Sequence, residues 1–244
     1  MNFLLKKILL YTLCFLFLLS SSHAVAFNQS IPTFKAEYKL SHNNIEIGQV
    51  SLSVNQLANG QYQLRSSTKT SGLLAFIRDD DVLETSLFEL KKNQLRPLSY
   101  QYLQVLGDEE KNVRLQFNWP EKTLINSSKG KTWRLTLSDG TLDKALLQIA
   151  LMLDLRDIAN HSLSYQVADG GKLKTYAFSP VGFEKIDVAG KQYNTLKLAR
   201  QKDDKPLITY YWCAVDFYNL PILLQREKSY GTFEMRLLSV TFTG

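Results

Sequence analysis

Cysteine and histidine are scarce in this chain, which has two cysteines and three histidines in 244 residues. His42 and His161 each stand beside an asparagine, with no other histidine or cysteine nearby in the sequence. A metal site needs donors at compatible spacing, so we predict no bound metal. Because Cys14 lies in an N-terminal apolar run that we expect to be removed, Cys213 has no partner for an internal disulfide.

Motifs of nucleophilic and nucleotide chemistry are also missing. The sequence has no G-x-S-x-G elbow, no phosphate-binding glycine loop and no dinucleotide fingerprint. We therefore predict no cofactor and no enzymatic activity, although two carboxylates from separate strands could still meet in space. The net charge of +6 is too mild to indicate a nucleic-acid partner.

The N-terminal segment has the three parts of a secretory signal peptide. Two lysines precede an apolar run over residues 8–19, and small residues follow up to Ala24 and Ala26. This run is too short for a spanning helix, and no later run is longer. We expect residues 1–26 to be cleaved before Phe27, with a cut after Ala24 as the alternative. The mature protein would then lie in the periplasm without a transmembrane helix.

After a short tail at residues 27–32, apolar and polar residues alternate along most of the chain. Residues 34–40, "FKAEYKL", follow this period of two, which is typical of half-buried antiparallel strands. In residues 45–54 the phase slips at Gly48, which predicts a β-bulge. Turn residues recur at short intervals and no linker divides the chain. We predict a single, mainly β domain over residues 33–244: a large antiparallel meander of about a dozen strands, curled into a barrel or half-barrel.

One stretch departs from this pattern and predicts a helix over residues 141–158. It contains no glycine or proline, and Asp143 lies in the first turn, where an acid suits the helix dipole. Its wide apolar arc predicts burial against the concave face of the curled sheet. That space is either a filled core, the plainer interpretation, or a ligand pocket. The residues nominated for the concave face, its ligand or its core are Trp133, Leu146, Ile149, Leu153, Tyr211, Trp212 and Cys213.

Cys213 lies in the apolar strand pattern of residues 209–215. Alternation places it on one face with Tyr211, and it places Trp212 on the other. A reactive thiol needs exposure and a nearby cation or helix N-terminus. The local sequence offers neither, so we interpret Cys213 as a small buried apolar residue.

Several segments follow one another along the chain in an order that is similar to that of a known family. They are "FKAEYKL" with "IEIGQVSLSV", "LRPLSYQY", "FNW", "DGTLDKALLQIALML", "VAGKQYNTLKLAR" and "YWCAVDFYNLPILLQ". With these segments the chain from residue 34 onward resembles the exported bacterial proteins grouped as domain of unknown function 3108. The resemblance implies a largely β, envelope-associated protein, and it brings no activity, cofactor or catalytic residue. Cys213 and Val215 depart from the pattern, which weakens any idea of a shared thiol chemistry.

Three functional hypotheses follow from the sequence. The favoured one is a non-enzymatic periplasmic protein that binds a lipid, another amphiphile or an envelope protein through its curled sheet. The second is a hydrolase or transferase that acts on an envelope polymer with two carboxylates on the concave face. The third is a structural scaffold that docks envelope proteins by an exposed edge strand.

Overall fold

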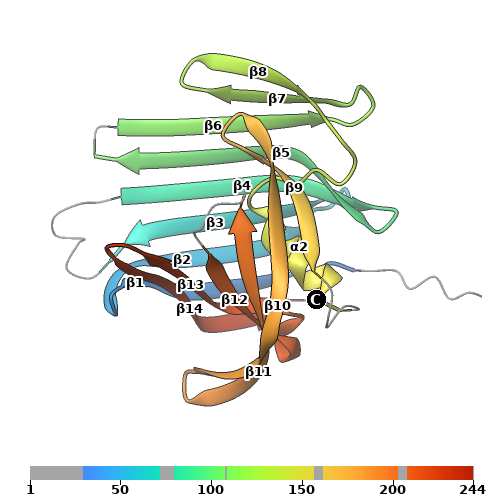
Figure 1. Ribbon diagram of the computed structural model, residues 1–244. Coiled ribbons are helices and arrows are strands. Elements are labelled where there is room, and N and C mark those ends of the chain that lie inside the picture. The colour runs from blue at the N-terminus through green and yellow to red at the C-terminus, as the bar shows by residue number, and fades with distance from the viewer. Residues whose placement is uncertain (1–29, 72–79, 108, 157–161, 203–207, 244) are drawn as a thin grey trace, which may run out of the picture. The chain divides into compact units, whose positions relative to one another are not determined.

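A computed structural model of the chain describes residues 30–71, 80–107, 109–156, 162–202 and 208–243 (Figure 1). Residues 31–244 form one compact unit, which contains every described strand. The predicted signal peptide, with its cleavage residues Ala24, Ala26 and Phe27, lies outside the described residues.

The described strands pair into a single 14-stranded sheet. Its order is β8-β7-β6-β5-β4-β3-β2-β1-β14-β13-β12-β11-β10-β9, so the first and last strands are neighbours in the middle and β8 and β9 are the two edges. The strands are β1 (Phe34–His42), β2 (Ile45–Gln56), β3 (Tyr62–Thr70), β4 (Asp80–Lys91), β5 (Gln94–Leu106), β6 (Glu109–Asn118), β7 (Thr123–Ser128), β8 (Lys131–Thr136), β9 (Leu163–Asp169), β10 (Lys172–Val188), β11 (Lys191–Lys202), β12 (Thr209–Ala214), β13 (Leu220–Lys228) and β14 (Gly231–Phe242).

The sheet is a curled antiparallel meander with two arms, one from β1 to β8 and the other from β14 back to β9 (Figure 1). Every ladder is antiparallel, and no ladder among the described residues joins β8 to β9, so the sheet is not closed. The predicted fold class, a large antiparallel meander curled into a barrel or half-barrel with one buried helix, is confirmed. The described strands number 14, compared with the roughly one dozen expected.

The predicted β-bulge at Gly48 is present. In the ladder of β1 with β2, Leu40 faces Gly48 while Ser41 faces Glu46, so Ile47 is the extra residue. A Cβ atom on Gly48 would lie 2.7 Å from the backbone oxygen of Lys69 on β3. The close approach of a neighbouring strand therefore requires glycine at this position.

The buried helix is α2 (Leu146–Asp154), which is shorter than the predicted span of residues 141–158. It begins late because Leu142 pairs in parallel with Val167 on the edge strand β9. The Leu142 amide donates to the Gln166 carbonyl and its carbonyl accepts from the Ala168 amide, both at 2.8 Å. Residues 157–158 lie outside the described ranges. Among the described residues, no helix has the length and apolar character needed to cross a membrane.

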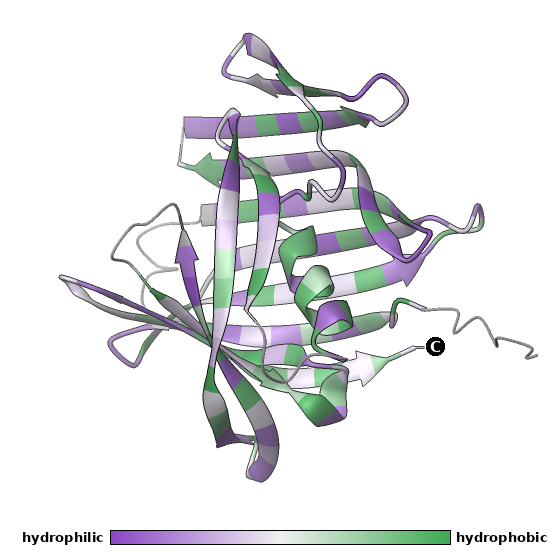
Figure 2. Ribbon diagram, turned by 45° about the vertical axis from the view of Figure 1, so that its right-hand side comes forward, coloured by the Kyte–Doolittle hydropathy of each residue, from purple (hydrophilic) through white to green (hydrophobic). Residues whose placement is uncertain are grey.

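Most residues of α2 are apolar, and the helix is buried in the main hydrophobic core on the inner side of the sheet (Figure 2). Residues from both arms join this core, among them Phe34 and Tyr38 of β1 and Leu196 of β11. A second, smaller core lies under β5 to β7 and includes Leu115 and Leu124. The helix thus fills the middle of the concave face and leaves space toward its ends.

Candidate functional site

The two faces of β12 have different surroundings. Tyr211 and Cys213 belong to the main core, opposite Leu198 and Leu196 of β11. Trp212 lies on the other face, where its indole N–H donates to Glu184 Oε2 at 2.6 Å. Cys213 and Tyr211 therefore face the concave side of the sheet, and Trp212 does not.

Cys213 is completely buried and pairs with no other cysteine. Burial raises the pKa of its thiol far above the ordinary range. The thiolate is the reactive form of cysteine. This environment fits the structural interpretation of Cys213.

The other nominated residues divide between the core and a hollow. Leu146, Ile149 and Leu153 of α2 are buried in the main core. Trp133 of β8 is 41% exposed and lines a hollow on the inner side of the sheet. Sequence reasoning therefore nominated one aromatic residue of this hollow, and it missed the polar residues beside it.

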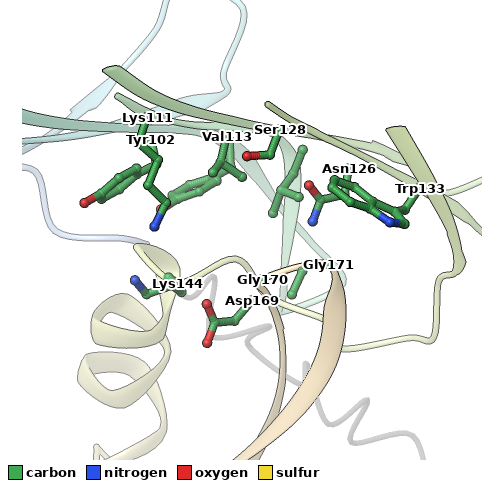
Figure 3. Close-up of a pocket in the computed structure, with 13 residues that line it drawn as sticks. Tyr102, Lys111, Val113, Asn126, Ser128, Trp133, Lys144, Asp169, Gly170 and Gly171 are labelled. Atoms are coloured by element: carbon green, nitrogen blue, oxygen red, sulfur yellow. The ribbon is translucent and has the colours of Figure 1, made fainter. Parts of the chain in front are cut away.

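We call this hollow the lysine pocket (Figure 3). Strands β5 to β8 form one wall, and Lys144 with the β9–β10 turn lies across from them. Its volume is about 260 Å³. It is defined by Tyr100, Tyr102, Lys111, Val113, Leu115, Asn126, Ser128, Trp133, Lys144, Ala168, Asp169, Gly170 and Gly171.

The register of the sheet explains why these residues meet. Tyr102 of β5 pairs with Val113 of β6, which pairs with Ser128 of β7. Two residues along, Leu115 pairs with Asn126, which pairs with Trp133 of β8. Residues paired across antiparallel strands share a face, and positions two apart return to it. The two rows form one continuous wall.

Positive charge gathers around Tyr102. The Lys111 and Lys144 ammonium groups lie 5.4 and 5.8 Å from the centre of its ring. Neither lysine takes part in an ion pair between described residues. The one carboxylate among the residues that line the pocket, Asp169, already accepts from Lys174 Nζ at 2.9 Å. The pocket therefore presents two cations and a largely neutralised acid.

Asn126 adds a specific polar feature to the wall. It is 2% exposed, and its Oδ1 atom is buried without a hydrogen-bond partner. A buried acceptor without a partner costs about 1–3 kcal/mol. A ligand that donates a hydrogen bond at this point would recover that cost.

Two carboxylates, Glu84 and Asp143, lie near each other on the concave side. Glu84 accepts from the Tyr100 hydroxyl at 2.6 Å, and Asp143 accepts from the Ser86 hydroxyl at 2.6 Å. Burial raises the pKa of Asp143 to about 7, and the charge of Glu84 adds to the shift. Asp143 is fully buried, and its Oδ1 atom accepts from the Leu146 amide at 3.0 Å at the start of α2. This acid supports the helix and is closed to a polymer substrate.

Comparison with known proteins identifies a family and a fold. The family profile described as "Protein of unknown function (DUF3108)" matches residues 33–238. No curated protein matches the sequence. A crystal structure from Brucella abortus, a "Beta-barrel-like Protein of Domain of Unknown Function DUF1849", is similar with a TM-score of 0.58 and 8% sequence identity. The match covers 88% of this chain and 99% of that chain, and at this identity it shows a shared fold alone.

Proposed function

Since this chain belongs to the DUF3108 family, whose function is unknown, we propose a role from its own geometry: it is a non-enzymatic periplasmic protein that binds an amphiphile in the lysine pocket. The N-terminal lysines, apolar run and small residues support export. The burial of Asp143 supports a binding role over hydrolysis, because one of the two inner carboxylates is closed to a substrate.

One observation carries the proposal. The lysine pocket combines apolar and aromatic walls with two lysines outside any described ion pair and the unpartnered Oδ1 atom of Asn126. Ligand pockets typically hold about 300–1,000 Å³ and pair apolar walls with a few placed polar groups. A hollow of about 260 Å³ suits a single ring or a short stretch of acyl chain, with an anionic end near Lys111 and Lys144.

The experiment compares two matched tryptophan variants. Val113→Trp fills the pocket wall, whereas Val105→Trp adds the same bulk where β5 is 37% exposed. Gently purified wild-type protein is analysed by native mass spectrometry before and after organic extraction, and all proteins are titrated with a fluorescent fatty acid. We expect a co-purified amphiphile in the wild type, loss of one bound fatty acid per chain in Val113→Trp, and wild-type binding in Val105→Trp.

Two results would refute the proposal. The first is wild-type protein that carries no amphiphile and does not bind the fluorescent fatty acid. The second is equal binding by Val113→Trp and Val105→Trp, which would place any ligand elsewhere. Circular dichroism of both variants shows whether they keep the wild-type content of β-strand.

A further inference from the structure

A second hollow lies on the inner side of the other arm of the sheet, and we call it the arginine pocket. It holds about 270 Å³ and takes residues from β1, β2 and β11 to β14. Its walls are mainly apolar, with two arginines among them. The residues that define it for the argument are Leu40, Arg200, Tyr211, Leu224, Arg226 and Met235.

Strand register sorts these residues into two neighbouring rows. In the apolar row Leu40 pairs with Met235, and Leu224 joins Met235 to Tyr211. The adjacent row carries the charges: Arg226 pairs with Thr209, which pairs with Arg200. The two arginines are thus two strands apart, which places their Cα atoms about 10 Å from each other. Long side chains at this spacing can converge above Thr209.

Arg200 lies over aromatic rings. Its guanidinium carbon is 5.0 Å from the centre of the Tyr176 ring and 5.6 Å from that of Tyr211. Its Nη2 atom donates to Thr209 Oγ1 at 3.2 Å, while its Nε atom is buried without a partner.

Arg226 is less well accommodated. Its Nε atom is also buried without a partner, and neither arginine appears in an ion pair between described residues. Glu234, the acid at the edge of this hollow, accepts from Arg236 Nε at 2.8 Å on its own strand. Burial raises the pKa of Tyr211, and the charges of Arg200 and Arg226 both oppose that rise. The charges of both arginines therefore lower the pKa of the same tyrosine, Tyr211.

Two arginines in a mainly apolar hollow, each with a buried Nε atom that lacks a partner, are costly. Burying an N–H group without an acceptor carries a desolvation penalty, and two like charges repel each other. An oxyanion removes both costs, because a carboxylate or phosphate accepts forked hydrogen bonds from arginine and balances its charge. The adjacent row of Leu40, Met235 and Leu224 offers apolar contact to whatever carries the oxyanion.

We propose that the arginine pocket binds the oxyanion headgroup of an anionic amphiphile, with Arg200 and Arg226 on the headgroup and the apolar row against the first carbons of the tail. This site is separate from the lysine pocket, and its residues come from other strands. The proposal does not depend on ligand binding at the lysine pocket.

The test uses three probes that separate the oxyanion from the tail. Delipidated full-length protein is titrated by calorimetry with dodecanoate, with dodecanol and with inorganic phosphate. Arg226→Gln removes one pocket cation. Arg114→Gln makes the same change in charge at an exposed residue of β6 that lines neither pocket. Arg226→Lys keeps the charge and loses the fork, and every variant is made in the Val113→Trp background, in which the lysine pocket is filled.

In the Val113→Trp background we expect Arg226→Gln to weaken the remaining dodecanoate binding at least tenfold and Arg226→Lys to weaken it by a smaller factor, while Arg114→Gln leaves it unchanged. Dodecanol and inorganic phosphate should each bind at least tenfold more weakly than dodecanoate. Equal dodecanoate affinity in Arg226→Gln and Arg114→Gln would overturn the site. Phosphate binding as tight as dodecanoate binding would overturn the role of the tail. Complete loss of dodecanoate binding in Val113→Trp would assign this ligand to the lysine pocket and refute the present proposal.

Discussion

The middle and the ends of the concave face differ in how completely they are filled. In the middle, Leu151 and Met152 of α2 are fully buried. The Tyr38 hydroxyl donates to the Pro221 carbonyl at 3.1 Å, and Asp143 accepts from both Ser86 and the backbone. At the two ends lie the lysine pocket and the arginine pocket, whose walls include polar atoms without partners.

Buried polar atoms without a hydrogen bond are unevenly distributed between these regions. Four buried side-chain nitrogen or oxygen atoms of the described residues lack a hydrogen bond. Three of them, Asn126 Oδ1, Arg200 Nε and Arg226 Nε, belong to residues of the two end pockets. The fourth is Gln148 Nε2 on α2. A short helix packs against this wide sheet, and three of the four unpartnered atoms belong to residues of the two pockets, which no residue of α2 lines.

The largest effect that separates the two regions is the loss of packing in the middle. Leu151 is fully buried, so Leu151→Ala should leave a cavity and lower the free energy of unfolding by about 4 kcal/mol. Val113→Ala, in the wall of the lysine pocket, should cost about 1 kcal/mol or less, because that side chain already borders open space. Urea unfolding of both variants measures the difference. Equal losses would mean that the two regions are packed alike.

A smaller effect concerns the acid that supports α2. Burial raises the pKa of Asp143 from an ordinary 3.8 to about 7, so between these values the folded protein holds a proton that the unfolded chain has lost. The free energy of unfolding therefore falls as pH rises from about 4 to 7, by about 3 kcal/mol for this group. Asp143→Asn should lose this pH dependence and be the more stable protein at pH 8. Urea unfolding at pH 5 and pH 8 tests it, and parallel pH profiles for the two proteins would contradict it.

Local pattern was enough to predict the strands and the burial of the helix. Alternation in residues 34–40 predicts the buried positions of β1, and the phase slip at Gly48 marks the bulge. The start of α2 could not be read in this way. Its delay to Leu146 depends on the pairing of Leu142 with Val167, a contact between distant parts of the chain.

The pockets were harder to predict than the fold. Alternation separates Trp212 from Cys213, but the inner face of β12 is decided by the curl of the whole sheet and by the partners of each face. Because polar residues on strands usually face water, nothing in their residue type predicted Asn126 and Arg226 as pocket residues. One signal was available for Asn126, which shares a strand face with the fully buried Leu124.

The smallest effect has opposite signs for stability and for binding, and it tests whether the end pockets are adapted to a ligand. Asn126→Leu replaces a buried, unpartnered acceptor with an apolar group of similar size, so the ligand-free protein should gain about 1 kcal/mol in free energy of unfolding. Asn194→Leu, at an exposed position of β11, should change it by less than about 0.5 kcal/mol.

Asn126→Leu should also weaken the binding of dodecanol in the lysine pocket, because the alcohol hydroxyl can donate to Oδ1 whereas a carboxylate cannot; Asn194→Leu should leave this binding unchanged. Urea unfolding of delipidated protein and a calorimetric titration with dodecanol measure the two effects on the same samples. A destabilised Asn126→Leu variant would mean that Oδ1 is satisfied in the free protein and would remove the contrast between the middle and this end. A stabilised variant that binds less ligand would show that the protein gives up stability at this atom in exchange for recognition, as functional sites commonly do.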